Sequence, residues 1–243
     1  MATLIDWIIY FLVLFIPFFL IVILPFMLSW IFGAKELRKT QDKYLRILLE
    51  WARRKKLKLS GKESSILKLV VSFSSEKPAG LITVIITLIE RRNWVWYFLK
   101  LIRKTPSDRF LIQVESVRPP SALLYMIPLT RRKILTKIAG YLANLMSLSG
   151  IIESYSIYSD DPTAANYFTR KIITLSENAE KYIDYVIVDY ASPHIEISGK
   201  VKKGHELLYS LELALSLLQR FPFVKGKRPR EDIAKFLRKA LME

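Results

Sequence analysis

The chain has 243 residues, which is enough for a membrane segment beside one medium or two small soluble domains. It contains no cysteine, and this excludes disulfides, thiolate catalysis and thiolate-bound metals. Its 38 Lys and Arg against 22 Asp and Glu give a formal net charge of +16, so the expected partners are anionic: lipid headgroups, nucleic acid or acidic proteins.

Near its start the chain has 28 consecutive uncharged residues, between Asp6 and Lys35. As a helix they would span about 42 Å, more than the roughly 30 Å hydrocarbon core of a bilayer. Trp7 and Tyr10 near one end and Trp30 at the other are spaced like two interfacial aromatic belts. A cleavable signal would need a basic start and small residues before its cleavage site, which this segment lacks. We therefore expect a permanent transmembrane helix.

Two prolines, Pro17 and Pro25, lie within this segment and predict a kinked helix that packs against another helix. Basic residues follow the segment directly, whereas no Lys or Arg precedes it. Because positively charged flanks stay in the cytoplasm, we expect a single-pass protein of the cell membrane with its N-terminus outside and the rest of the chain in the cytoplasm.

Residues 34–60 carry ten basic and three acidic side chains, and their apolar residues recur at helical spacing. They predict a basic amphipathic helix next to the membrane. Its apolar stripe either lies on anionic lipid, where each basic side chain contributes about 1 kcal/mol, or packs on the chain's own soluble domain. In the first alternative the lipid-facing basic residues are Lys35, Arg38, Lys39, Lys43, Arg46, Arg53, Arg54, Lys55 and Lys56.

After Gly61 the pattern changes to that of strands. Residues 66–73 and 81–89 are apolar and β-branched, and the turn chemistry of Pro78 and Gly80 between them predicts a hairpin. Three more stretches follow: 91–106, which fits a strand by its aromatics and a helix by its spacing; 110–117, a strand; and 121–129, an edge strand or loop because it contains Pro128.

The second half of the chain alternates more regularly. The pattern predicts helices at 131–148, 162–181, 205–221 and 229–242, and strands at 151–159, 183–190 and 194–201. This order favours an α+β fold: a single N-terminal transmembrane helix followed by a cytoplasmic antiparallel-sheet domain with helices on one face. The expected divisions are a transmembrane anchor (1–33), a basic juxtamembrane helix (34–60), a β-rich subdomain (61–128), an α/β subdomain (129–224) and a basic C-terminal helix or tail (225–243).

Charge is spread unevenly along this chain. Residues 151–199 contain eight acidic and three basic side chains, whereas residues 225–243 contain three acidic and seven basic ones. Because anionic lipid repels acidic surface, we expect the 151–199 section to project into the cytoplasm, where it could meet a basic partner.

Few residues suggest chemistry. Asp160 and Asp161 could bind Mg²⁺ or act as acid and base, but Asp161 before Pro162 is more typical of a helix N-cap. His194 alternates with Ile195, and with Glu196 it is expected on a solvated strand face. We expect no cofactor and no metal site, and these three residues are only weak catalytic candidates.

The pattern favours a non-catalytic, membrane-anchored scaffold, adaptor or accessory subunit of a membrane protein complex. Its expected partners are the membrane, anionic lipid headgroups and a protein at the cytoplasmic face or in the membrane. Two alternatives stay open: a membrane-tethered enzyme acting on a lipid or phosphorylated substrate, and a membrane-tethered nucleic-acid or ribosome-binding protein. The second would stack bases on the aromatic residues that follow Arg91 and Arg92 and use the basic tail.

Overall fold

The computed structural model describes residues 4–75, 79–92, 102, 106–117, 120, 122–129, 146–147, 155–163, 166–167, 170, 182–190, 192–220 and 239. The chain divides into two compact units, which are described separately. The first comprises Met1–Lys43 with Leu88–Pro106, and the second comprises Tyr44–Thr87 with Ser107–Glu243. Helix α2 (Leu24–Arg54) contributes to both units, since its residues up to Lys43 belong to the first and the remainder to the second.

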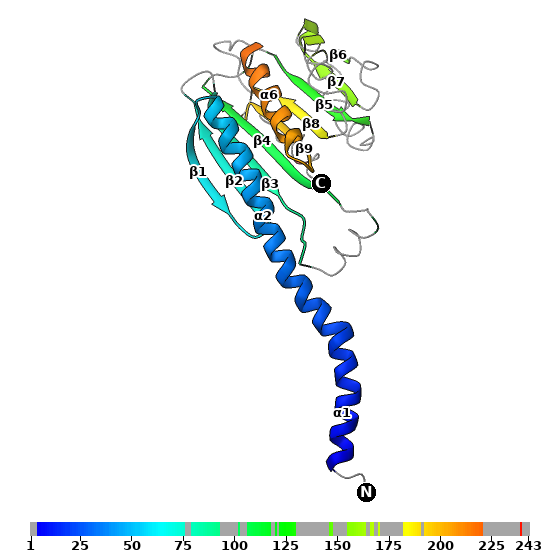
Figure 1. The fold of residues 1–243 in the computed structure, drawn as a ribbon. Coiled ribbons are helices and arrows are strands. Elements are labelled where there is room, and N and C mark those ends of the chain that lie inside the picture. Colours follow the sequence, from blue (N-terminus) through cyan, green and yellow to red (C-terminus); the bar gives the residue numbers. More distant parts are fainter. Residues whose placement is uncertain are drawn as a thin grey trace. The chain divides into compact units, whose positions relative to one another are not determined.

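The first unit begins with a long apolar helix that is long enough to cross a membrane. It consists of α1 (Leu4–Phe18), a π-helical turn η1 (Phe19–Ile23) and the start of α2 (Figure 1). Its most apolar 18-residue window has a mean hydropathy of 3.0, and none of that window is buried in the protein. The helix therefore fits a membrane anchor by length and composition, a test that a signal sequence also passes.

The two prolines coincide with a local change in helix type. Pro17 lies inside α1 and Pro25 is the second residue of α2, so they flank the π-helical turn. Within that turn the N–H of Leu24 donates to the carbonyl of Phe19, five residues back. Helices kink most often at prolines and at π-helical turns, so the regular α-helical bonding is interrupted where the sequence predicts a kink.

The second unit is built on one antiparallel sheet. Its order is β1-β2-β3-β4-β9-β8-β5-β7-β6 across the nine strands that the described residues form. Their bounds are Lys58–Ser64 (β1), Lys68–Ser74 (β2), Ala79–Thr87 (β3), Asp108–Ser116 (β4), Leu124–Pro128 (β5), Met146–Ser147 (β6), Tyr155–Ser159 (β7), Ile183–Val188 (β8) and Ile195–Val201 (β9). The α+β class is confirmed.

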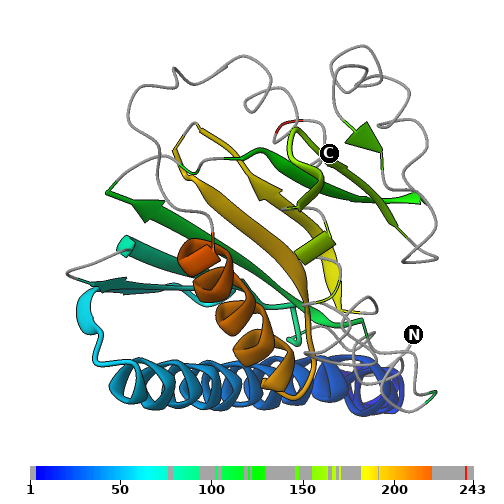
Figure 2. The same cartoon turned by 90° about the horizontal axis from the view of Figure 1, so that it is seen from above.

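One face of this sheet is apolar and is covered by helices. Along β2, β3 and β4 every second side chain is buried, as a two-residue period requires. The C-terminal part of α2 and helix α6 (His205–Arg220) cover that face (Figure 2). Trp51 of α2 packs edge-on against Phe73 of β2, with ring centroids 6.1 Å apart, and its indole N–H donates to Glu212 of α6 at 3.0 Å. Tyr44 donates its hydroxyl to Asp108 of β4 at 3.0 Å.

The apolar stripe of α2 therefore packs on the chain's own sheet, which is the second alternative for the basic helix. Tyr44, Leu48 and Trp51 are all less than 5% exposed. The apolar sheet face needs a cover, and this stripe supplies it. The nine basic residues predicted to face lipid, from Lys35 to Lys56, are all exposed.

Several predicted elements are confirmed. The hairpin is β2 and β3, which pair from Lys68 with Thr87 to Ser74 with Leu81. The strands predicted at 110–117, 183–190 and 194–201 are β4, β8 and β9, and the helix predicted at 205–221 is α6. The strand predicted at 151–159 is β7 over its described part.

The predicted end of the basic helix was wrong. The helix stops at Arg54, and residues 58–60 already belong to edge strand β1. Lys56 adopts a positive φ of 56°, the N–H of Leu57 donates to the carbonyl of Ala52 at 2.9 Å, and the N–H of Lys56 donates to Arg53 at 3.2 Å. These two bonds form a Schellman motif, in which Lys56 occupies the left-handed position that glycine usually takes.

Two further predictions were wrong. The 121–129 segment is not an edge, because β5 lies between β8 and β7 in the sheet. Its pairing with β8 runs only from Leu124 to Met126, so the missing N–H of Pro128 removes no bond on that side. Met146 and Ser147 form strand β6 and do not end a helix. The helix predicted at 229–242, apart from residue 239, and most of the segments predicted at 91–106, 131–148 and 162–181 lie outside the described residues.

Candidate functional site

The first unit contains a close crossing between α2 and the chain segment that follows β3. Ser29 and Gly33, one helical turn apart on α2, face this segment. Ser29 is only 5% exposed. A Cβ atom added to Gly33 would lie 2.5 Å from the carbonyl carbon of Arg91 and 2.6 Å from the Cα of Arg92. Only glycine allows the two backbones to approach so closely. We call Ser29, Gly33, Thr40, Glu90, Arg91 and Arg92 the clasp.

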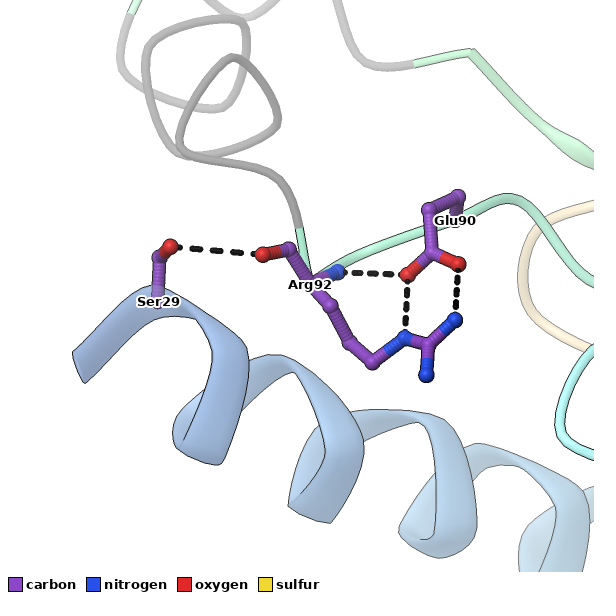
Figure 3. Close-up of polar contacts among 3 residues, drawn as sticks. All are labelled: Ser29, Glu90 and Arg92. Carbon is purple, nitrogen blue, oxygen red and sulfur yellow. Dashed lines mark hydrogen bonds and ion pairs between the residues drawn. The ribbon is translucent and has the colours of Figure 1, made fainter. Parts of the chain in front are cut away.

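Polar bonds fix both ends of the clasp. The Ser29 hydroxyl lies 2.8 Å from the carbonyl oxygen of Phe26 and 3.3 Å from that of Arg92 (Figure 3). Thr40 lies two turns beyond Gly33 on α2. Its hydroxyl accepts a hydrogen bond from the guanidinium of Arg91 at 2.5 Å and donates one to the carbonyl of Glu36 at 2.8 Å. Arg91 is 8% exposed and Thr40 is half-buried, so the bond between them is partly shielded from water, which strengthens a polar bond.

Glu90 and Arg92 lock the same segment into a tight local fold. The carboxylate of Glu90 accepts from the backbone N–H and the Nε of Arg92, both at 2.8 Å, and from its Nη2 at 2.6 Å (Figure 3). The bonds from the Arg92 side chain lower the pKa of Glu90 from its ordinary value, despite the opposing effect of burial. The pair is therefore a two-pronged, charge-assisted contact that keeps the Arg92 carbonyl directed at Ser29.

The clasp lies where the apolar helix becomes charged, since Gly33 is two residues before Lys35. The contacts of the clasp are structural, because they hold a second chain segment against the candidate anchor at that boundary. The predicted anchor residues Trp7, Tyr10 and Trp30 are 71%, 67% and 54% exposed, so they are largely uncovered in the part of the chain that the structure describes. Sequence reasoning missed the clasp, although two small residues four apart in a bulky apolar helix are a known signal of close helix packing.

The predicted chemical residues make structural bonds. Asp160 accepts from the N–H of Leu123 at 2.7 Å and from the hydroxyl of Tyr190 at 2.8 Å. Asp161 accepts from the N–H of Thr163 at 2.8 Å, the bond that an N-cap carboxylate makes. His194 accepts the N–H of Ser116 at Nδ1, 3.1 Å away. Each residue thereby fixes a loop or helix end.

The expectation of a solvated face around His194 and Glu196 was wrong. Glu196 is fully buried, where it accepts from Tyr185 at 2.7 Å and from Gln113 at 3.2 Å, and His194 is half-buried. Asp189, also buried, accepts from Tyr125 at 2.5 Å. Among the described residues no three His, Cys, Asp or Glu side chains gather as a metal ion would require. These carboxylates are bonded to tyrosine and glutamine donors within the sheet.

Glu206 gives a testable pH dependence. Its carboxylate accepts from the N–H groups of Gly204 at 2.8 Å and Lys203 at 3.2 Å, at the start of α6. Burial raises the pKa of Glu206, but hydrogen bonds from its own backbone N–H and from those of Gly204 and Lys203 outweigh burial, and the net pKa lies below the ordinary 4.5. The charged form thus stabilises the fold above pH 4.5, and that contribution is lost as the pH falls through the folded-state pKa.

We expect Glu206→Gln to lower the free energy of unfolding at neutral pH by about 1 kcal/mol, as loss of a cap does. It should also flatten the acid limb of the stability curve below pH 4.5. Urea unfolding at several pH values measures both effects. Glu63→Gln, on the fully exposed strand β1, is the control and should leave the curve unchanged. An equally steep acid limb in Glu206→Gln would assign the pH dependence to other groups.

Comparison with known proteins gives only distant likenesses, and these are to solved structures. No known family matches this sequence, and no curated protein is similar to it at a significant level. Among solved structures, it resembles the crystal structure of the mycobacterial trehalose monomycolate transport factor A, TtfA, with 14% sequence identity and a TM-score of 0.39. The likeness covers 74% of this chain and 97% of that one. At that TM-score it carries no functional argument.

Proposed function

We propose that this chain is a single-pass, membrane-anchored accessory subunit or scaffold of a membrane protein complex. The observation that carries the proposal is the uncovered apolar helix: the 18-residue window of highest hydropathy has no buried part. Exposure of so large an apolar surface to water is unfavourable, so in this proposal lipid or another membrane protein covers it. Helix α2 continues from this anchor into the second unit, where Tyr44, Leu48 and Trp51 are core residues.

The charge pattern supports an orientation for the proposed anchor. Lys35, Arg38, Lys39 and Lys43 follow the apolar segment and are exposed, whereas residues 1–6 before it contain no Lys or Arg. By the positive-inside rule the N-terminus is outside and the sheet domain is in the cytoplasm. The same side chains would attract anionic headgroups, each contributing about 1 kcal/mol.

A scaffold role accounts for the bonds of the candidate chemical residues. Asp160, Asp161 and His194 each accept a hydrogen bond from a backbone N–H, and such bonds stabilise loops. In this proposal the anchor concentrates the domain at the membrane, and the domain provides the contact with a protein partner. The acidic section 151–199 remains the proposed contact for a basic partner.

Membrane insertion and orientation are tested together. We expect the full-length chain to resist extraction by alkaline carbonate, with its C-terminus digested by trypsin in inside-out vesicles and protected in right-side-out ones. Mass spectrometry of the mature chain should still find residues 1–33. A mature chain that begins after residue 33 would show a cleaved signal and overturn the proposal.

The accessory role is tested by native mass. After solubilisation in mild detergent, we expect the chain to co-purify with at least one other membrane protein in a fixed ratio. A monomer that elutes without partners, from membranes in which the chain is correctly inserted, would contradict this role.

A further inference from the structure

All chain connections between the two units lie at one end of the sheet of the second unit. The chain enters or leaves this unit at Tyr44, Thr87 and Ser107. Thr87 pairs with Arg109, and the hydroxyl of Tyr44 donates to Asp108, the residue that follows Ser107. The three points are therefore neighbours in the second unit. We call this end of the sheet, where β3 ends and β4 begins, the connection end (Figure 1).

A row of exposed basic side chains crosses the connection end. Thr87 pairs with Lys68 of β2 and with Arg109 of β4, and Arg109 pairs with Lys200 of β9. Directly paired residues share a face of the sheet, and the next residue along β4, Phe110, is buried on the helix-covered face, so the row lies on the other face. Two lysines follow β9 in the next turn. We call the five exposed basic residues the basic rim: Lys68, Arg109, Lys200, Lys202 and Lys203.

Among the described residues, few carboxylates offset the basic rim at the surface. Asp184 lies 3.9 Å from Lys200, and Glu63 is exposed on strand β1. Two more, Asp108 and Glu206, are 3% and 2% exposed and already accept hydrogen bonds. With five basic groups against two surface carboxylates, the connection end attracts anions.

Apolar and aromatic side chains lie at the same end as the basic rim. Ile66, in the turn between β1 and β2, is 57% exposed. His205, at the start of α6, contacts the rings of Tyr182 and Tyr209, each at a centroid distance of 5.8 Å, and Tyr209 is 40% exposed. Tyrosines and basic side chains together are typical of surfaces at the membrane–water interface.

The connection end is also the part of the second unit that is nearest to the proposed anchor along α2. Tyr44 is nine residues after Lys35, the first charge that follows the apolar segment. Nine helical residues rise about 14 Å, of which the headgroup layer takes about 5–7 Å. The remaining distance of about 8 Å is one Debye length at physiological ionic strength, so the charges can attract headgroups. The segment Leu88–Pro106, which leaves and re-enters the second unit here, has five basic residues and one acidic residue by sequence, so its charge has the same sign.

We propose that the connection end contacts the bilayer surface, with the basic rim on anionic phospholipid headgroups and Ile66 in the headgroup layer. The inference rests on the proposed function and identifies the lipid contact of the sheet domain. It differs from the set of basic residues that the sequence predicts to face lipid, because α2 ends at the opposite end of the sheet, where Lys58 of β1 pairs with Ser74 of β2. Lipid is favoured over nucleic acid because the rim lies at the end that the anchor holds near the bilayer.

Quenching by nitroxide-labelled headgroups tests this contact in the full-length chain. Because the chain has no cysteine, one introduced cysteine carries a fluorophore at a single place. Ile66→Cys places it at the connection end, and Leu59→Cys, 51% exposed near the opposite end of the same hairpin, is the matched control. In vesicles of phosphatidylcholine and phosphatidylglycerol, we expect quenching to be at least about fivefold stronger at residue 66 than at residue 59. In phosphatidylcholine alone this difference should disappear.

Two triple variants with equal changes of charge test the basic rim itself. The rim variant combines Lys68→Gln, Arg109→Gln and Lys200→Gln. The control variant, at the opposite end of the sheet, combines Arg53→Gln, Arg54→Gln and Lys58→Gln, which are also exposed. Each basic group near an anionic surface favours contact about fivefold, so the rim variant should weaken the contact about a hundredfold and abolish the excess quenching at residue 66. The control variant should retain it.

The outcomes separate this inference from the proposed function, since resistance to alkaline carbonate is measured on the same vesicles. If the chain resists extraction but the two labels are quenched alike, or the rim variant keeps the excess quenching, the lipid contact fails and the anchor stands. If the chain is extracted, the proposed function itself fails. A label at residue 66 that lipid leaves unquenched, but whose emission changes on addition of single-stranded RNA, would assign this end to nucleic acid and overturn the proposal.

Discussion

Replacing Gly199 by alanine is expected to lower the free energy of unfolding by about 3 kcal/mol, the upper end of the usual cost of overpacking. Gly199 lies in β9, where it pairs with Phe110 of β4 and Ile183 of β8. An added Cβ would lie 2.6 Å from the ring of Phe110 and still closer to the backbone oxygen of Tyr182. A backbone atom cannot turn aside as a side chain does, so adjacent strands must separate.

The measurement is thermal unfolding of the detergent-solubilised chain, followed by circular dichroism. For a chain of this size a loss of about 3 kcal/mol corresponds to a fall in Tm of roughly 6–12 °C. Gly61→Ala is the matched control, because the nearest atom to its added Cβ is 4.0 Å away, on Ser72. Its stability should change by less than about 0.5 kcal/mol. An equal loss of stability in the two variants would show that the sheet accommodates the added methyl group at Gly199, contrary to the prediction.

The strands of the second unit were predictable because one face is buried. Leu69, Val71 and Phe73 alternate with less buried residues, and that period of two is readable without any knowledge of what covers the face. β5 was harder to interpret, because Leu124 to Ile127 are all buried and its proline suggested an edge. A strand covered on both faces shows no alternation, so its place in the sheet order depends on partners distant in the sequence.

The end of α2 illustrates a different limit. A Schellman motif normally announces itself through glycine, but here Lys56 takes the left-handed conformation within a run of basic residues. The prediction from the sequence therefore extended the helix too far and missed strand β1. Burial of Glu196 was unpredictable for a related reason: its partners Gln113 and Tyr185 come from neighbouring strands β4 and β8.

The clasp could be predicted only in half. Ser29 and Gly33 are visible in the sequence as small residues in a bulky helix, and they indicate that something packs there. The segment that packs there contains Arg92, which is 63 residues after Ser29 in the chain, and no local sequence pattern specifies this contact. The Glu90–Arg92 pair shapes that segment, but surface pairs of this kind are common and carry no positional information.

Gly33→Ala tests whether the clasp holds the segment on α2, and the sign of its effect is diagnostic. Alanine inside a helix is normally stabilising relative to glycine, by up to about 1 kcal/mol. Here the added Cβ would lie 2.6 Å from the Cα of Arg92, so the segment must move away from α2. Arg91, now 8% exposed, would then become accessible to trypsin. We expect cleavage after Arg91 or Arg92 to accelerate about tenfold or more, since each 1.4 kcal/mol of opening is a factor of ten.

The rate is measured in a time course of limited trypsin digestion, with the cleavage sites identified by mass spectrometry. Ser29→Ala should give a smaller acceleration, because it removes only a 3.3 Å bond and leaves the close approach intact. Gly61→Ala, whose added Cβ meets only the Ser72 Cβ at 4.0 Å, should cleave after Arg91 at the wild-type rate. Slower cleavage in Gly33→Ala would mean that helix propensity outweighs the contact, and that the clasp does not bind this segment to the anchor.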